Sequence, residues 1–341
     1  MFSIILATRN RPALFGEALR SVLAQTHQDM EIIVVDDGSD EAFAAGYRRI
    51  LESATRQVQF HSLVRRANGH GQSYALNFGA VKSSGGYLCF LDDDDCWTDP
   101  GYLSRARRSI EARHGAVDLH LSNQVAFSGD VQKKGPIWIE DLMDRLRSSG
   151  RTPSPDGAYD VTIKDLLGCN GFCHLNTLIS RRALFLEAGG MDETLRWECD
   201  HDLYFRLIDR ANSIVYAPGF VARHNIPDPA ASASMTTGLS ELQRRLFQLR
   251  VFDKAALFAS HPAIRAYGRR HRGYTLKRIA EELAKGNDYG AAYHYARTAL
   301  GALPTAKWAA YTAALGVKAA LQARRRTLGK SQPGPEEQAG R

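Results

Sequence analysis

Four aspartates in a row, Asp92 to Asp95, directly follow an apolar segment at residues 87–91. Adjacent carboxylates repel one another, so such a run is costly unless water or a cation screens its charge. Carboxylate oxygens are ligands that Mg²⁺ and Mn²⁺ prefer. The sequence therefore predicts a divalent-metal site at this point of the chain, and a solvated acidic turn is the alternative.

Two further aspartates, Asp200 and Asp202, lie at the start of a predicted helix. Residues two apart on a helix point about 200° apart around its axis, so only one of them can face a ligand. We predict that Asp200 faces the ligand. Asp202 is then a structural carboxylate that complements the positive end of the helix.

The elements that must position these residues alternate between β-rich and helical patterns over the first hundred residues. Strands are predicted at residues 3–8, 31–36, 58–64 and 87–91, and helices at 12–25, 42–54 and after residue 71 to 81. Such alternation predicts a largely parallel sheet with helices on both faces. Ligands bind beyond the carboxyl ends of such strands, where three polar clusters fall: residues 7–10, 36–39 and 92–95.

The rest of the chain gives weaker signals. Residues 129–159 are predicted to form a mobile loop or lid around a short helix at 139–146. From residue 241 onward the pattern is helical and alanine-rich, with breaks at 286–288 and at Pro304. Residues 331–341 are predicted to be disordered.

Composition limits the class of protein. A hydrophobic fraction of 44% is typical of a globular chain, and no apolar run reaches the roughly 18 residues of a membrane span. The N-terminus resembles a first strand more than a basic leader, and the five cysteines have no zinc-binding spacing. We therefore expect a cytoplasmic protein with reduced thiols.

Several segments, in order, resemble motifs of family-2 glycosyltransferases with the GT-A fold. Residues 90–100 (FLDDDDCWTDP) resemble the family's FLDxDDxW…P, and residues 3–12 (SIILATRNRP) resemble its SVIIPTYNRP. Further similar segments are residues 31–39 (EIIVVDDGS), 68–69 with 75–79 (NG…ALNFG), 189–193 (GGMDE) and 199–207 (CDHDLYFRL). The resemblance covers residues 1–225 and implies a Rossmann-like α/β fold with a largely parallel central sheet, followed here by a C-terminal helical segment.

The resemblance implies an inverting glycosyltransferase that moves a sugar from a nucleoside-diphosphate sugar, expected to be a UDP-sugar, to an acceptor hydroxyl. Cell-envelope or exopolysaccharide glycan synthesis is the expected setting. Asp94 would bind the Mn²⁺ or Mg²⁺ that bridges the two phosphates, and His224 would be a late metal or phosphate ligand. Asp200 would be the general base.

The nucleotide would be held by the remaining motif residues. Asp37 would accept from a pyrimidine N–H, and Asp92 or Asp93 would hold the ribose hydroxyls. The whole expected nucleotide-sugar site consists of Ala7, Thr8, Arg9, Asp37, Asn68, Gln72, Asp92 and Asp93.

Three positions depart from the family pattern. Cys199 stands where the family has an acid before the base, with Glu198 one residue earlier. Leu76 replaces an arginine, which removes a phosphate contact that Arg66 or Gln72 could supply. Arg9 replaces a tyrosine, which changes how the base pocket is closed. None of the three removes the expected metal ligand or base.

We expect four regions: a donor-binding half at residues 1–115, an acceptor-binding and catalytic half at 116–235, a basic helical segment at 236–330 and the tail at 331–341. Residues 261–330 hold 14 Lys or Arg against 3 Asp or Glu. Two interpretations of this segment remain open. One is peripheral contact with the anionic inner face of the membrane, through an apolar helix face of Trp308, Tyr311 and Leu315 that precedes three arginines at 324–326. The other is a helical hairpin packed on the catalytic domain with a solvated basic face.

The expected partners are the nucleotide-sugar donor and a glycan or lipid-linked acceptor, without nucleic acid. Two alternative functions are weighed against the glycosyltransferase. A catalytically inactive binding scaffold of the same fold would lack the chemistry that Asp94 and Asp200 provide. A sugar-phosphate nucleotidyltransferase would need a glycine-rich, basic loop after the first strand, which residues 7–10 do not form.

Overall fold

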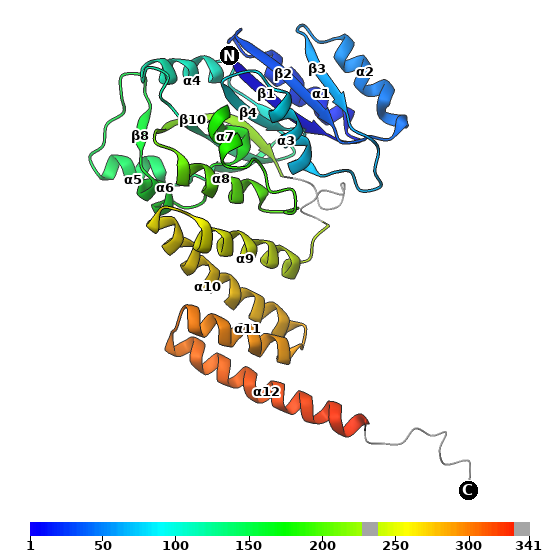
Figure 1. Cartoon of the computed structure of the whole chain (residues 1–341), viewed down its shortest axis with the longest axis vertical. Helices are drawn as coiled ribbons and strands as arrows, with labels where there is room; N and C mark the ends of the chain where they lie inside the picture. The colour runs from blue at the N-terminus through cyan, green and yellow to red at the C-terminus, as the bar shows by residue number, and fades with distance from the viewer. Residues whose placement is uncertain (227–237, 331–341) are drawn as a thin grey trace. The chain divides into compact units, whose positions relative to one another are not determined.

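The computed structural model describes residues 1–226 and 238–330, so the expected disorder of residues 331–341 lies outside the described residues (Figure 1). The strands are β1 (Phe2–Thr8), β2 (Met30–Asp36), β3 (Val58–Ser62), β4 (Tyr87–Asp92), β5 (Cys96–Trp97), β6 (Leu119–Ser128), β7 (Val131–Ile137), β8 (Tyr159–Val161), β9 (Leu178–Arg181) and β10 (Ile214–Asn225).

The helices are α1 (Pro12–Leu23), α2 (Ala44–Glu52), α3 (Gln72–Lys82), α4 (Tyr102–Glu111), α5 (Leu142–Ser148), α6 (Ile163–Gly168), α7 (Arg182–Glu187), α8 (Cys199–Arg210), α9 (Glu241–Phe258), α10 (Pro262–Lys285), α11 (Tyr289–Ala302) and α12 (Ala306–Lys330). Helices α1 to α3 alternate with the first four strands, as the pattern predicts. Two short 3₁₀ helices, η1 (Glu41–Phe43) and η2 (Leu175–Thr177), complete the described elements.

The strands form one mixed sheet in the order β3-β2-β1-β4-β9-β6-β10-β5. Strands β3, β2, β1 and β4 run parallel, and β10 runs parallel to β6. Strand β9 pairs antiparallel with both β4 and β6, so it joins the two parallel parts of the sheet. The carboxyl ends of β1, β2 and β4 therefore lie at one edge, as expected.

Alternate residues of the first strands bury opposite faces of the sheet. Ile4 and Val34 belong to the core cluster that packs against α1, together with Phe15 of that helix. Ile33 and Val35 point the other way and cluster with Ala75 of α3. Burial on both faces explains why these strands are continuous apolar runs.

One expectation for the second half of the chain is wrong. Residues 129–159 are not a loop around a helix alone, because β7 pairs antiparallel with β6. The predicted short helix is present as α5, which begins at Leu142. The strand was missed because its sequence, VQKKGPI, has no alternation of apolar and polar residues, and its backbone pairing with β6 supplies the stability that its side chains do not.

The chain divides into two compact units, Met1–Thr237 with Ala259–Ile264, and Gly238–Phe258 with Arg265–Arg341. The second unit has its own core, in which alanines of α11 pack with Leu276, Trp308 and Leu315. The expected membrane-facing side of Trp308, Tyr311 and Leu315 is therefore wrong, because these side chains pack inside the unit. Helices α10, α11 and α12 are separated at the predicted breaks, near residues 286–288 and Pro304.

Within the described part of the chain, no helix combines the length and the hydropathy that crossing a membrane requires. The five cysteines are free thiols, and four of them are buried, as the scattered spacing predicts.

Candidate active site

The four aspartates after β4 lie in four different environments. Asp93 is 2% exposed and is tied to the end of β1, because its carboxylate accepts a 2.7 Å hydrogen bond from the Thr8 hydroxyl and lies 2.6 Å from Nη2 of Arg11. Asp94 also faces Arg11, at 3.0 Å, but is more exposed. Arg11 therefore neutralises part of the charge on the middle of the run.

Asp95 is buried and connects the run to two distant segments. Its Oδ2 accepts hydrogen bonds from Asn176 Nδ2 at 2.5 Å and from His224 Nδ1 at 2.8 Å, and its Oδ1 accepts from the backbone N–H of Asn225 at 2.7 Å. Asn176 also binds Asp92, by accepting from its backbone N–H at 3.0 Å. These contacts hold the aspartate turn between η2 and β10.

The residues present fit a divalent cation. One carboxylate oxygen from each of Asp92, Asp94 and Asp95 lies within 4.8 Å of the others. Burial raises the pKa of Asp92 well above its usual range, and the charges of Asp95 and Asp94 raise it further. Burial is also the main cause of the raised pKa of Asp94. The cluster therefore takes up either protons or a cation, and an all-oxygen set suits a hard cation.

The two expected metal ligands, Asp94 and His224, lie in different positions relative to the oxygen cluster. Asp94 belongs to this oxygen cluster, whereas His224 is not a member of it. His224 uses Nδ1 to contact Asp95, so only Nε2 is left for a ligand. Burial lowers the pKa of His224, but the hydrogen bond to Asp95 and the charge of that carboxylate outweigh burial and raise it overall.

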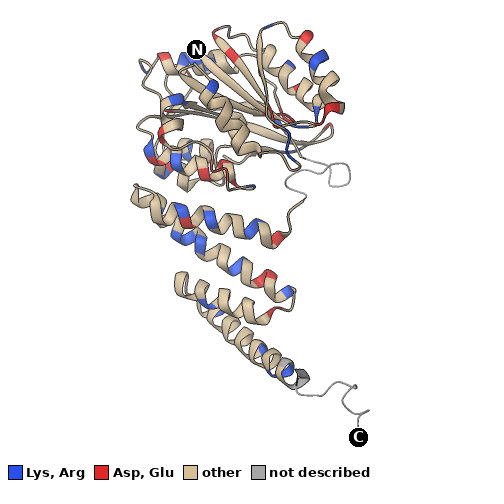
Figure 2. Cartoon of the chain, turned by 45° about the vertical axis from the view of Figure 1, so that its right-hand side comes forward, with Lys and Arg blue, Asp and Glu red and all other residues tan. Residues whose placement is uncertain are grey.

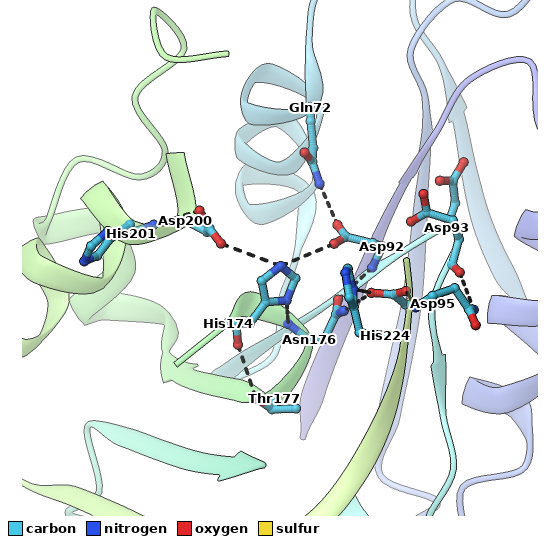
Figure 3. Close-up of polar contacts among 12 residues, drawn as sticks. Gln72, Asp92, Asp93, Asp95, His174, Asn176, Thr177, Asp200, His201 and His224 are labelled. Carbon is cyan, nitrogen blue, oxygen red and sulfur yellow. Dashed lines mark hydrogen bonds and ion pairs between the residues drawn. The ribbon is translucent and has the colours of Figure 1, made fainter. Parts of the chain in front are cut away.

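Asp200, at the start of α8, faces the aspartate cluster across a histidine (Figure 3). Nε2 of His174 lies 3.6 Å from Oδ2 of Asp200 and 3.8 Å from Oδ2 of Asp92. Asp202 does not share this environment, because it is 2% exposed and its carboxylate forms a 2.7 Å ion pair with Arg206. The structure thus brings Asp200, and not Asp202, to the cluster.

His174 and Asn176 are site residues that sequence reasoning missed. They lie in η2 or directly before it, 79 or more residues from the aspartates and 24 or more from Asp200. Their only signal is polarity just ahead of residues 178–181, which form β9, and many loops share such polarity. Burial, which is the largest effect on His174, lowers its pKa, which favours the neutral imidazole.

The other expected nucleotide-binding residues line the ends of β1, β2 and α3. Both oxygens of Asp37 accept backbone N–H groups, from His70 at 2.7 Å and from Gly71 at 2.9 Å. Gln72 donates to Asp92 at 2.5 Å. The backbone of Gly69 has φ +65, and a Cβ there would overlap the Asp37 carboxylate, so this approach requires glycine.

Arg9 contacts the loop at residues 66–71 as well, because its Nη2 donates to the carbonyl oxygens of Arg66 and Ala67 at 2.9 and 3.0 Å. Asn68 is exposed in this loop, and Ala7 is partly exposed at the end of β1. The structure therefore groups the expected residues into a loop cluster around Asp37 and an acidic cluster around Asp92.

These elements and this edge of the sheet define a class of protein. Residues 3–182 match the family model described as Glycosyl transferase family 2, which is more than half of the chain, so the chain belongs to that family. The resemblance inferred from the motifs is confirmed.

Similar proteins include an uncharacterized glycosyltransferase of Rickettsia typhi, 27% identical over 251 residues that make up 71% of this chain and 68% of the relative. Another, from Nostoc sp., is 37% identical over 152 residues, 43% of this chain and 46% of the relative. The chain thus matches about half to two thirds of the length of these relatives.

Solved structures share the fold. One is S. aureus TarS in complex with UDP-GlcNAc, with a TM-score of 0.64 and 17% identity over 89% of this chain and 81% of that chain. Another is the mannosyltransferase PcManGT from Pyrobaculum calidifontis in complex with GDP-Man and Mn²⁺, with a TM-score of 0.56 and 18% identity over 94% of this chain and 86% of that chain. The predicted GT-A fold is therefore confirmed.

Proposed function

We propose that this glycosyltransferase moves a sugar from a UDP-sugar to an acceptor hydroxyl, with inversion at the anomeric carbon. The observation that carries the proposal is the placement of Asp200 opposite the cluster of Asp92, Asp94 and Asp95. A direct displacement requires a base on one side of the sugar and, on the other side, a cluster that can hold the diphosphate.

The proposed reaction is a single displacement. The acceptor oxygen forms a bond to the anomeric carbon while the bond from that carbon to the diphosphate oxygen breaks. Asp200 takes the hydroxyl proton, and the electron pair leaves with the nucleoside diphosphate. Attack opposite the leaving group inverts the anomeric centre.

Asp94, with oxygens of Asp92 and Asp95 close by, would hold a Mn²⁺ or Mg²⁺ ion, and His224 would offer Nε2 at the edge of the same cluster. When bound, such an ion stabilises negative charge on the departing diphosphate. Mn²⁺ in the structure of PcManGT, a protein of the same fold, supports this assignment. Arg11, paired with Asp93 and Asp94, keeps the run from repelling the donor.

We assign the ribose contact to Asp92, because its side chain is 21% exposed and that of Asp93 is 2% exposed and already bound by Thr8 and Arg11. Asp37 would read the base through lone pairs that its two backbone N–H partners leave free. Ala7, Arg9, Asn68 and Gln72 would complete this half of the site. The UDP-GlcNAc complex of TarS supports a uridine donor, and the GDP-Man complex of PcManGT makes guanosine donors the necessary comparison.

We divide the roles along the chain as the motifs suggest. Residues 1–115 would bind the donor, and residues 116–235, which include His174 and Asp200, would bind the acceptor and supply the base. A glycan or lipid-linked acceptor of cell-envelope or exopolysaccharide synthesis is proposed for the second half.

We also propose that the second unit contacts an anionic bilayer on its cytoplasmic face. Figure 2 shows lysine and arginine positions along α9 to α12. On α12, Val317 and Leu321 are 62% and 54% exposed one turn apart, and the exposed Arg324 and Arg325 follow on the next turn. An exposed apolar pair beside cations suits the surface of such a bilayer.

The deciding experiment is a donor screen. UDP-, GDP- and dTDP-sugars are each added with Mn²⁺ to the full chain, and thermal unfolding is followed; a true donor at 100 times its Kd stabilises the fold by about 2.7 kcal/mol. Each stabilising donor is then assayed for release of the nucleoside diphosphate. Stabilisation and release with a UDP-sugar are expected.

Two outcomes would overturn parts of the proposal. A donor that binds but is never cleaved, with any acceptor, would favour the inactive scaffold. Stabilisation by GDP-sugars alone would reject the uridine assignment while leaving the reaction class intact.

A further inference from the structure

His174 is placed where it can contact the two functional carboxylates at once. The residue precedes η2, and in Figure 3 its ring points between Asp200 of α8 and Asp92 of β4. The two Nε2–oxygen distances, 3.6 Å to Asp200 and 3.8 Å to Asp92, are nearly equal. His174 therefore links the two sides of the site.

The hydrogen-bond pattern assigns the proton on this ring. Nδ1 of His174 accepts the backbone N–H of Asn176, at 3.4 Å, so Nδ1 carries a lone pair. In the neutral imidazole the proton then lies on Nε2, the atom that faces the carboxylates. A donor at 3.6 Å is beyond hydrogen-bond length, but a movement of about 0.5 Å brings it into range, as often happens when a site closes on its substrate.

The ring is held in place by packing. Trp138 stacks on it with ring centroids 4.5 Å apart and an interplanar angle of 25°. The Trp138 backbone has φ +69, in the left-handed region that bulky side chains rarely adopt. A Cβ at Gly171 would overlap the Trp138 carbonyl, so glycine is required where the two segments meet. A strained residue that the surroundings fix in place is typical of functional sites.

We propose that His174 is a positioning residue, whose Nε2–H orients the carboxylate of Asp200 toward the acceptor and keeps it apart from Asp92. Without a donor between them, two carboxylates that face the same atom would repel and turn away from each other. This inference rests on the proposed role of Asp200 as the base. It assigns to His174 no proton transfer and no contact with the sugar.

The test compares variants that separate the donor from the ring. His174→Gln keeps an N–H near the position of Nε2 and loses the ring, whereas His174→Phe keeps the ring that stacks on Trp138 and loses the donor. His174→Asn is smaller than the native residue and its amide is too short to reach Asp200, so it tests the same loss if the Phe variant does not fold. Asp200→Asn is the reference for loss of the base.

We expect the Phe and Asn variants to lower kcat about 10- to 100-fold, which is usual for residues that orient a functional ligand. The KM for the donor should stay within about twofold, and the Gln variant should recover most of the loss. A packing role predicts the reverse order, with Phe active and Gln impaired, and that result would overturn the proposal.

The same set of variants separates this inference from the proposed function. If Asp200→Asn turns over normally, the base assignment fails and His174 has no base to position. If Asp200→Asn is inactive while the Phe and Asn variants both match the native enzyme, only the positioning role is rejected.

Discussion

A single side chain in the aspartate run takes its role from residues far away in sequence. Asp95 is buried because Asn176 and His224, 81 and 129 residues further on, donate to it. Asp93 is buried because Thr8 and Arg11 approach from the end of β1. The run itself was predictable from local repulsion and strand position. Which carboxylate stays exposed was not, because that depends on partners that only the fold brings near.

Asp94 offers the clearest test of the metal assignment. Asp94→Asn should abolish transfer and remove the Mn²⁺ dependence of UDP binding, because the amide keeps the shape of the side chain and loses the charge that a cation needs. Binding of UDP with Mn²⁺ and with EDTA, measured by calorimetry, checks this. Asp130→Asn is the matched control, since Asp130 is fully exposed. Native turnover in EDTA would contradict the metal assignment.

The acidic cluster also predicts how the metal-free protein responds to pH. Burial raises the pKa of Asp93 to about 7, and Asp92 and Asp94 are raised as well. Between the unfolded pKa, about 4, and pH 7, the folded state therefore binds more protons than the unfolded state, so the unfolding free energy falls as pH rises through this window.

Thermal unfolding in EDTA should accordingly give a lower Tm at pH 8 than at pH 5, and Mn²⁺ should reduce the difference because it replaces the protons. Asp93→Asn, which cannot titrate, should show a smaller loss than the native chain. A Tm in EDTA that rises from pH 5 to pH 8 would contradict this account.

At the scale of elements, segments with a periodic apolar pattern could be predicted from sequence, whereas a strand that forms only because a neighbouring strand pairs with it could not. Strands β1, β2 and β4 and helices α1 and α3 lie within a few residues of their predicted bounds, because burial on both faces leaves a strong apolar pattern. Strand β7 contains Gly135 and Pro136 and exists because β6 offers it a partner. The η2 segment, which carries Asn176 and directly follows His174, is too short to leave a periodic signal.

The proposed contact of the second unit with an anionic bilayer can be tested on helix α12. Its inner face, including Trp308 and Leu315, packs in the core of the unit, so removing the helix would unfold its partners. We therefore change only the exposed face: Val317→Gln with Leu321→Gln, and separately Arg324→Gln with Arg325→Gln. Both pairs should reduce co-sedimentation with vesicles of phosphatidylcholine and phosphatidylglycerol, because apolar area and charge both contribute.

Arg48→Gln with Arg49→Gln, which removes two exposed charges from α2, is the matched control and should bind vesicles like the native chain. Binding of the native chain should weaken in high salt. Equal sedimentation with anionic and with pure phosphatidylcholine vesicles would leave α12 as a packed helix with a solvated basic face.

At the scale of the whole molecule, the first unit is built from two separate stretches of the chain. Its second stretch, Ala259–Ile264, is joined to α8 by Asp209, whose carboxylate accepts the backbone N–H groups of Ser260 and His261, each at 2.7 Å. Ile264 in the same stretch is fully buried. The order of the first four strands and of the helices between them could be predicted from sequence, but this return of the chain could not, because nothing in the alanine-rich pattern marks it.

Asp209→Ala should lower the unfolding free energy by about 1–2 kcal/mol, since two N–H groups lose a charged acceptor. Urea unfolding checks this, with Asp130→Ala as a control that should change stability by less than about 0.5 kcal/mol. Equal midpoints for the Asp209 variant and the native chain would show that these two hydrogen bonds do not stabilise the first unit.

The same arrangement sets the order in which the protein can mature during its synthesis. When Thr237 has left the ribosome, the enzyme's first unit still lacks the stretch that contains Ile264. That stretch follows Gly238–Phe258, and at about 5–20 residues per second its arrival takes roughly one to five seconds more. During that interval the nascent first unit contains its acidic site residues, but the buried side chain of Ile264 is still missing from it. The Asp209 carboxylate likewise still lacks the two N–H groups that it binds in the finished protein. The first unit can therefore be completed only after α9, the first helix of the second unit, has been synthesised.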